Sequence, residues 1–249
     1  RYIRIFLPNQ IFVKTHQNKF SQSININPGK WINKTGFLKT LSHFYNQTAF
    51  TIDRKIKQNH DNFDLNPFSD SQENLLGLNS SFRNSFYYNR GKQKHSFTYN
   101  FIKNNVKSLL NIGTIENSNS QNQLQYAHLV KQYWLINGTF SMGSATSKSD
   151  TYSSKNFELK NYSIEPKLTY LLDTNCSFSV FYEYKNKENQ INTLDKLQQQ
   201  KAGLTFNYLS EKSFTINAGY SFYSNNFTGN AQSPVGFAML EGLLPGKNS

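Results

Sequence analysis

Few side chains in this sequence have the types and spacing that chemistry requires, and the best candidates are two carboxylates. Glu165 and Glu183 lie in segments that alternate like neighbouring strands, so both could face one interior. Two carboxylates on either side of a sugar linkage are what glycoside hydrolysis needs. Lys167 and Lys185 each follow two residues later, on the same side of the same segment. We therefore interpret the four groups as balanced charges on a polar wall and predict that the protein is not an enzyme.

The other motifs are weaker. GLLPGKNS (242–249) has some letters of a phosphate-binding loop, but only three residues separate its glycines, and a turn built on Pro245 and Gly246 explains it better. No Gly-x-Ser-x-Gly sequence frames a nucleophile. The histidines lack the spacing of a metal site; they are His16, His43, His60, His95 and His128. We therefore predict no cofactor and no metal.

Composition limits the class of protein. Of the 249 residues 37% are hydrophobic and 15% are aromatic, which is too polar for a helical membrane protein and too aromatic for a disordered chain. No apolar run approaches about 18 residues, so we expect no transmembrane helix. The net charge of +12 comes from dispersed cations, and even the densest group, DRKIKQNH (53–60), lies at an expected loop. We therefore predict no nucleic-acid partner.

Most of the chain alternates with a period of two, as a strand with two different faces does. SFTINAGYSFYS (213–224) places on one side the residues Phe214, Ile216, Ala218, Tyr220 and Phe222. Such segments predict about ten strands of about nine or more residues, which is long for a soluble sheet. From 124 to 142 the apolar residues stay at even-numbered positions, which predicts one very long strand. The polar sequence ENSNSQN (116–122) predicts a loop before it.

The connections suggest how these strands are arranged. LLDTN (171–175) and LSEK (209–212) are short, whereas the polar connections at 144–156, 185–197 and 225–234 are long. Alternate connections of an up-and-down sheet lie at opposite ends, so short turns would line one rim and long polar loops the other. Outer-membrane barrels have this asymmetry. We therefore predict an all-β fold: an antiparallel up-and-down transmembrane β-barrel, or a portion of one, in a single domain over 1–249, with the weakest pattern in 1–65.

The composition of the two faces agrees with a barrel. One face is rich in Ser, Thr, Asn and Gly, which suits a water-lined lumen, and Tyr and Phe gather near strand ends as in membrane-interface girdles. A strand of about 11 residues at about 3.3 Å each, tilted by about 40°, spans roughly 28 Å, enough for the hydrocarbon layer. We expect these side chains to face lipid: Leu76, Leu78, Phe82, Phe86, Phe97, Tyr99, Phe178, Val180, Leu204, Phe206, Phe214, Ile216, Ala218 and Tyr220.

YSFYSNNFTGNAQSPVGFAMLEGLLPGKN (220–248) resembles the late part of large outer-membrane β-barrel proteins of Bacteroidetes-type bacteria, in which a similar SPVG-x-x-MLEGL-x-PGKN segment leads into the last strands. The resemblance covers residues 65–249, and NPFSD (66–70) is similar in style. It implies localisation in the outer membrane of an AT-rich Gram-negative bacterium and carries no catalytic residues. Such barrels end in a strand with a terminal aromatic, so we expect further strands after Ser249 and before Arg1.

Two functions remain open. In the first, the chain is an outer-membrane barrel that acts as a pore, or as a membrane-embedded subunit of a larger secretion, assembly or uptake complex. Its partners are then membrane lipid, other proteins of the complex and glycans at the extracellular loops. In the second, it is a soluble surface β-domain that binds polysaccharide, with Trp134 as the ligand platform. Pro166 favours the second, because proline in mid-strand removes a donor from the hydrogen-bond ladder.

Overall fold

The protein is a single antiparallel sheet of ten strands, seen in a computed structural model that describes residues 14–30, 37–58, 66–69, 75–90, 94–110, 113–173, 175–209 and 214–240. The strands are β1 (Lys14–Ile26), β2 (Phe44–Gln58), β3 (Leu75–Tyr88), β4 (His95–Leu110), β5 (Gly113–Val130), β6 (Trp134–Ser149), β7 (Phe157–Leu171), β8 (Cys176–Asn189), β9 (Lys196–Leu209) and β10 (Thr215–Thr228). Short helices are η1 (Pro28–Lys30), α1 (Phe37–Leu41), η2 (Ser153–Lys155) and α2 (Pro234–Leu240).

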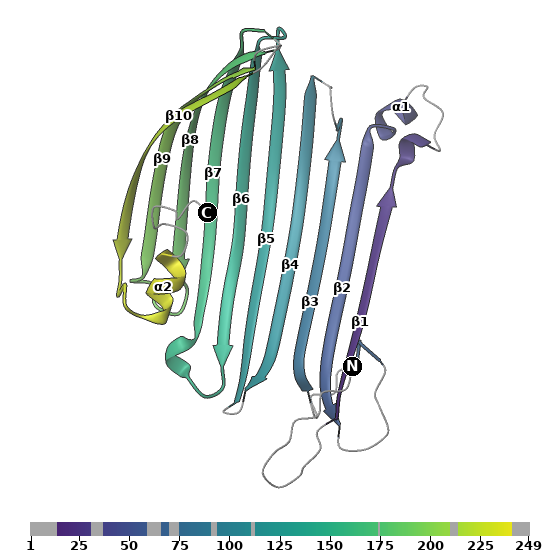
Figure 1. Cartoon of the computed structure of the whole chain (residues 1–249), viewed down its shortest axis with the longest axis vertical. Helices are drawn as coiled ribbons and strands as arrows, with labels where there is room; N and C mark the ends of the chain where they lie inside the picture. Colours follow the sequence, from purple (N-terminus) through teal and green to yellow (C-terminus); the bar gives the residue numbers. More distant parts are fainter. Residues whose placement is uncertain are drawn as a thin grey trace.

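Each strand pairs with the next one along the chain, from β1 to β10, so the sheet runs up and down without a crossover (Figure 1). This arrangement confirms the predicted antiparallel up-and-down fold of about ten strands and fits a portion of a barrel. Within the described residues β1 and β10 are the two edges of the sheet, and each has one strand neighbour.

The polar sequence ENSNSQN is strand, and the predicted loop there is wrong. It lies inside β5, which has 18 residues and pairs with β4 and β6 along its full length. Asn119, for example, is opposite Asn104 on one side and Ala145 on the other. The backbone of a central strand is held by ladder hydrogen bonds to both neighbours, so it stays extended where neither face is apolar.

The single long strand predicted over 124–142 is a hairpin. β5 ends at Val130, residues 131–133 turn, and β6 begins at Trp134, directly opposite Val130. Because three residues separate Val130 from Trp134, both strands place their even-numbered residues on the apolar face. The alternation of apolar and polar residues therefore continues through the turn without a break. Lys131 and Gln132 have φ of 48° and 66°, a left-handed conformation usually taken by Gly or Asn, and neither residue type indicates a turn.

The connections differ less in length than predicted. On the upper rim in Figure 1 the connections at 131–133, 172–175 and 210–214 have three to five residues. On the lower rim the connections at 150–156 and 190–195 have seven and six residues, because about half of each predicted polar loop belongs to the strands, which extend to Ser149 and Asn189. The connection at 27–43, on the upper rim, is long and carries η1 and α1.

The pairing register assigns the side chains to two faces. Directly opposite residues share a face, so Phe140, Ile164 and Tyr184 lie together, as do Val180 and Leu204. We call this side the apolar face. The polar face carries the alternate residues, including Thr169 and Ser179, which are buried. Large hydrophobic side chains of β5–β10 are exposed, the reverse of the pattern in a soluble domain with a dry core.

A bulge changes this alternation at one place, and a proline interrupts the ladder without changing it. Ile56 of β2 is opposite Leu75 while Lys55 is opposite Gly77, so a bulge makes Leu76 an extra residue without an opposite partner. Simple alternation predicted that Leu76 and Leu78 share a face. The bulge interrupts the alternation between these two residues, so that reasoning does not hold for Leu76. Pro166 interrupts the ladder between β7 and β8, yet β7 continues through it.

Two small clusters of apolar side chains occur among the described residues; the first is buried, and the second, with Phe68 51% exposed and Phe20 37% exposed, is not. The first lies on the polar face near the lower rim, where Met239 of α2 packs on Leu159 and Leu197. The second lies on the apolar face of β1 and β2, where the ring of Phe68 stacks on Phe50 and meets Phe20 edge-on. Strand β2 also includes residues 53–58, where the sequence predicted a loop.

Candidate functional site

The residues predicted to face lipid lie together on the apolar face. The register places there Leu78, Phe82, Phe86, Phe97, Tyr99, Phe178, Val180, Leu204, Phe206, Ile216, Ala218 and Tyr220. Phe214 comes just before β10, with its ring centroid 6.0 Å from that of Tyr208 on the same face. That these side chains contact lipid stays a prediction.

The apolar residues of this face form a band that crosses the strands obliquely. A line of directly paired residues from Phe50 in β2 passes Phe82 and then runs through Lys103, Ser120, Ser144, Lys160, Glu188 and Lys196 to Thr228 in β10. The apolar segment of β10, 216–222, is centred nine residues before Thr228. Nine residues are about 30 Å along a strand and eight strand spacings about 38 Å across, so the band lies about 38° from the perpendicular to the strands.

Aromatic residues border this band on both sides. Toward the upper rim Trp134 packs on Tyr170 with ring centroids 4.6 Å apart, and toward the lower rim Tyr162 meets Tyr184 at 5.9 Å. Along β7 the two tyrosines enclose Ile164, Pro166 and Leu168 on this face. Their separation of eight residues is about 26 Å along the strand.

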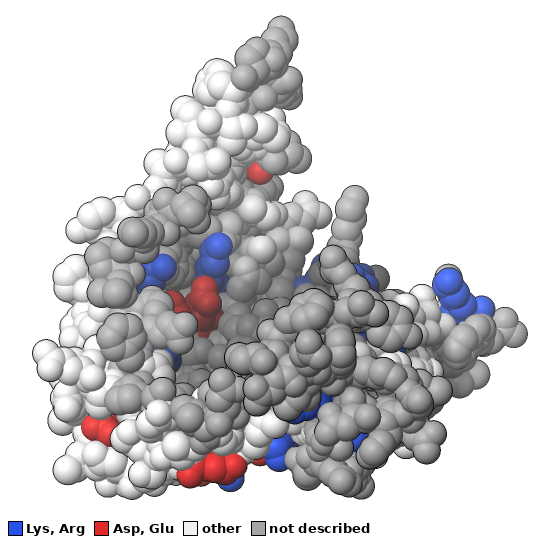
Figure 2. All heavy atoms as spheres, turned by 60° about the horizontal axis from the view of Figure 1, so that its bottom comes forward, with Lys and Arg blue, Asp and Glu red and all other residues white. Residues whose placement is uncertain are grey.

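The polar face is lined by hydroxyl groups and paired charges. Thr169 and Ser179 hydrogen-bond across β7 and β8 at 2.9 Å, and Ser141 and Ser163 do so across β6 and β7 at 2.6 Å. Basic residues dominate its charge on β7, β8 and β9: Lys167, Lys185, Lys187 and Lys201, with Glu165 and Glu183. Figure 2, which brings the lower rim forward, shows basic and acidic groups next to one another in the hollow of the sheet.

The candidate carboxylate pair does lie on this face. Glu183 forms an ion pair with Lys185, with 3.3 Å between Nζ and Oε1, which is the charge balance expected from the sequence. Glu165 is opposite Thr139 of β6. The absence of catalysis stays a prediction.

Helix α2 also packs on the polar face, in front of the strands near the lower rim (Figure 1). Met239 is 0% exposed, between Leu159 of β7 and Leu197 of β9, and its carbonyl oxygen accepts a 3.1 Å hydrogen bond from Lys187 Nζ. The chain after β10 therefore turns inward onto this face. Sequence analysis did not predict this, although SPVGFAML carries small and apolar residues at helical spacing. The glycine-rich end of the motif, 242–249, lies outside the described residues.

Two other predicted residues have aromatic partners. Trp134, the candidate glycan platform, lies 41% exposed on the apolar face, with one side against Tyr170. His128 stacks on His95 with ring centroids 4.2 Å apart, a pair that the sequence did not suggest. In the part of the chain that the structure describes, no three His, Cys, Asp or Glu side chains gather as a metal site would require.

Comparison with protein-family models gives no match, and comparison with curated proteins gives none either. None of the described helices is long and apolar enough to cross a bilayer. Function must therefore be inferred from the two faces of the sheet: one carries an oblique apolar band, and the other is polar, charged and partly covered by α2.

Proposed function

We propose that this chain is part of the wall of an outer-membrane β-barrel of a Gram-negative bacterium. It acts as a pore, or as a membrane-embedded subunit of a larger secretion, assembly or uptake complex, without catalysis of its own. The oblique apolar band is the observation that carries the proposal. Strands of outer-membrane barrels are tilted by about 35–45°, so a flat lipid layer contacts them along a band inclined by that angle. The band in this sheet is inclined by about 38°.

The aromatic borders support the same proposal. Tyrosine and tryptophan favour the membrane interface, where the ring is half buried and the polar group stays hydrated. With a tilt of about 38°, the 26 Å between Tyr162 and Tyr170 along β7 corresponds to about 20 Å across a membrane, close to the apolar height of about 25 Å in such barrels.

The polar face supports a lumen. Hydroxyls, amides and the Lys185–Glu183 pair would lie against water inside a barrel, whereas a soluble sandwich would need apolar side chains there or a second layer over the exposed apolar face. Among the described strands all ten belong to one sheet. At the lower rim the strands extend beyond the band with polar residues. We assign the lower rim to the extracellular side, because the connections of outer-membrane barrels are longer on that side.

A matched pair of substitutions on β9 tests the proposal. Leu204 lies within the band, 44% exposed, and Gln198 lies on the same face of the same strand in the polar extension. Leu204→Arg places a charge in lipid and is expected to lower the free energy of unfolding in vesicles by about 2–4 kcal/mol, whereas Gln198→Arg should cost at most about 1 kcal/mol. The measurement is urea unfolding of the complete barrel that contains this chain, folded into phosphatidylcholine vesicles.

The wild-type protein provides a second readout. A membrane barrel requires detergent for solubility, and its folded form changes mobility on heating before gel electrophoresis. Equal effects of the two arginine substitutions, or a monodisperse protein without detergent, would contradict the proposal and favour the soluble polysaccharide-binding domain.

A further inference from the structure

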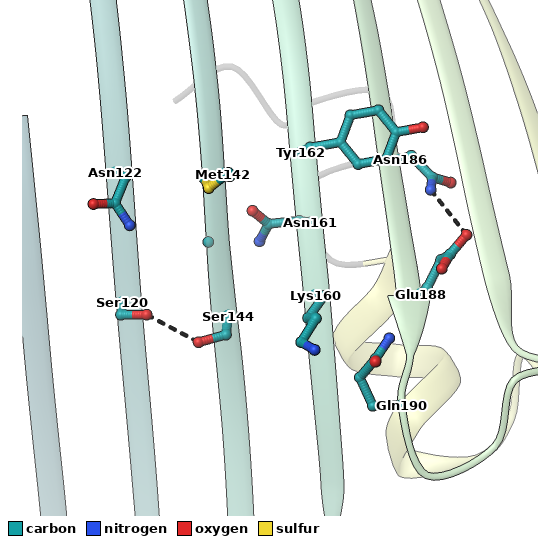
Figure 3. Close-up of a pocket in the computed structure, with 11 residues that line it drawn as sticks. Ser120, Asn122, Met142, Ser144, Lys160, Asn161, Tyr162, Asn186, Glu188 and Gln190 are labelled. Carbon is teal, nitrogen blue, oxygen red and sulfur yellow. Dashed lines mark hydrogen bonds between the residues drawn. The ribbon is translucent and has the colours of Figure 1, made fainter.

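An open groove of about 510 Å³ lies on the apolar face across β5–β8 (Figure 3). Figure 3 views the sheet from the side opposite to α2, which lies behind the strands. The groove is lined by Ser120, Asn122, Met142, Gly143, Ser144, Lys160, Asn161, Tyr162, Asn186, Glu188 and Gln190.

The groove lies on the lower edge of the apolar band. Met142 on β6 and Tyr162 on β7 are the last apolar residues of the band, and the next side chains on the same face are Ser144 and Lys160. One end of the groove is therefore continuous with the apolar band, and the other end is polar. A ligand that fits both ends is an amphiphile whose polar head group lies just outside the apolar layer.

The polar end offers a cation. Glu188 is the cross-strand neighbour of Lys160, yet its carboxylate interacts with Lys196 Nζ at 3.7 Å and accepts a 3.1 Å hydrogen bond from the Asn186 amide. Within the described residues Lys160 has no ion-pair partner. A lysine ammonium group beside Ser and Asn side chains suits a phosphate oxygen as ligand.

The polar end also offers groups that bind hydroxyls. Asn186 is 4% exposed, and its Oδ1 is buried without a hydrogen-bond partner among the described residues. A buried acceptor without a donor costs free energy, which a ligand hydroxyl or a water molecule would recover. Ser120 and Ser144 hydrogen-bond to each other at 2.9 Å on the floor of the groove, and Asn122 lies above them in Figure 3.

We propose that this groove binds the head group of a phosphorylated glycolipid of the membrane's outer leaflet. Lys160 binds the phosphate, Asn186 and the serines bind sugar hydroxyls, and the acyl chains lie along Met142 and Tyr162. The inference rests on the proposed function, because it requires lipid along the apolar band and the lower rim on the outside.

The test uses native mass spectrometry of the complete, detergent-solubilised barrel that contains this chain, with a bis-phosphorylated, acylated glucosamine disaccharide as the probe. Lys160→Gln is expected to weaken binding about tenfold, the effect of one charge-assisted contact. Lys167→Gln is the matched control: it removes the same charge from the same strand but from the polar face, and should leave binding unchanged.

The phosphate is tested separately with the dephosphorylated form of the lipid. The wild type should bind this form about tenfold more weakly, and Lys160→Gln should then make no further difference. Inorganic phosphate and the deacylated sugar phosphate should bind far more weakly than the lipid. Tight binding of inorganic phosphate would overturn the lipid assignment in favour of a simple phosphate site.

Equal affinities of Lys160→Gln and Lys167→Gln for the lipid would overturn the inference. Heat-modifiable folding and vesicle insertion of both variants, measured in parallel, would then leave the proposed function intact. Failure of the complete wild-type barrel, with the strands that flank this chain present, to insert into vesicles would instead overturn the proposed function and the glycolipid site together.

Discussion

Gly203 is a residue at which the polar face is closely packed. A Cβ at this position would lie 2.6 Å from two ring atoms of Phe181 and 2.8 Å from the backbone oxygen of Tyr220. The ring of Phe181 covers the glycine, and Lys201 Nζ lies 5.4 Å from the centre of that ring. A glycine in a strand usually weakens it, but here it allows an aromatic ring to lie flat on the backbone of the next strand.

We therefore expect Gly203→Ala to destabilise the protein by about 1–3 kcal/mol, because the added methyl group must displace Phe181 or separate β9 from β10. Gly138 is the control, since a Cβ there would meet nothing within 4 Å. Gly138→Ala should be neutral or slightly stabilising in the same urea titration. An equal loss for both glycines would show that strand backbone freedom, rather than contact with Phe181, sets the effect.

At the scale of elements, α2 is the one described helix that covers the polar face near the lower rim. It is short, so its own propensity contributes little, and it is held by the burial of Met239 and the hydrogen bond from Lys187. In a barrel this helix would occupy part of the lumen at the extracellular end.

Met239→Asp should detach α2, because it replaces a buried apolar side chain by an unpaired carboxylate. A loss of about 2 kcal/mol corresponds to about 30-fold faster hydrogen exchange in residues 234–240, with the amides of β8 and β9 unchanged. Gln232→Asp, at an exposed position before the helix, is the control and should not change exchange. Loss of protection throughout the sheet would contradict an independently docked helix.

The turn at 131–133 is the second element that makes a specific prediction. Lys131 and Gln132 adopt positive φ at a cost that Gly and Asn avoid. Lys131→Asn combined with Gln132→Gly should therefore stabilise the β5–β6 hairpin by about 1 kcal/mol in urea unfolding.

The control is Tyr133→Gly, which alters the third residue of the same turn, whose φ is not positive. It should give no gain in stability. A gain of similar size from Tyr133→Gly would contradict the prediction. It would indicate that a more flexible turn is favourable in itself, and that the gain does not come from relief of the left-handed conformation at residues 131 and 132.

At the scale of the whole molecule, the sheet has two open edges. β10 is exposed along nearly its whole length on both faces, and β1 pairs with β2 alone among the described strands. If the sheet lies in a membrane as proposed, its unpaired backbone groups are costly there, and each edge would then require another strand. Further strands of the same protein, or of a partner subunit, would complete the wall.

We expect that β1 and β10 of one chain do not meet. With Cys176 replaced by Ser, the pair Ser21→Cys and Ser221→Cys should give no disulfide within a chain on a non-reducing gel. The pair Ser21→Cys and Thr51→Cys is the positive control, because these residues are opposite each other in β1 and β2 with hydroxyl oxygens 3.2 Å apart. Efficient linkage of Ser21→Cys to Ser221→Cys would mean that ten strands close a small barrel.

The sequence alone determined that the chain is all-β and which side of most strands is apolar. Alternation is a local property, set by successive side chains of an extended chain pointing to opposite sides. It therefore predicted the apolar face from Leu78 to Tyr220. It failed at Leu76, where a bulge depends on the neighbouring strand, and at 131–133, where the turn residues carry no turn signal.

Only the tertiary structure decided where strands end and how they align. Ladder hydrogen bonds from β4 and β6 keep the polar part of β5 extended, and the register between strands far apart in sequence gives the band its inclination. The inward position of α2 and the groove at Lys160 likewise depend on residues from several strands. Pairing across the sheet is a non-local interaction, so a period of two along the chain cannot encode it.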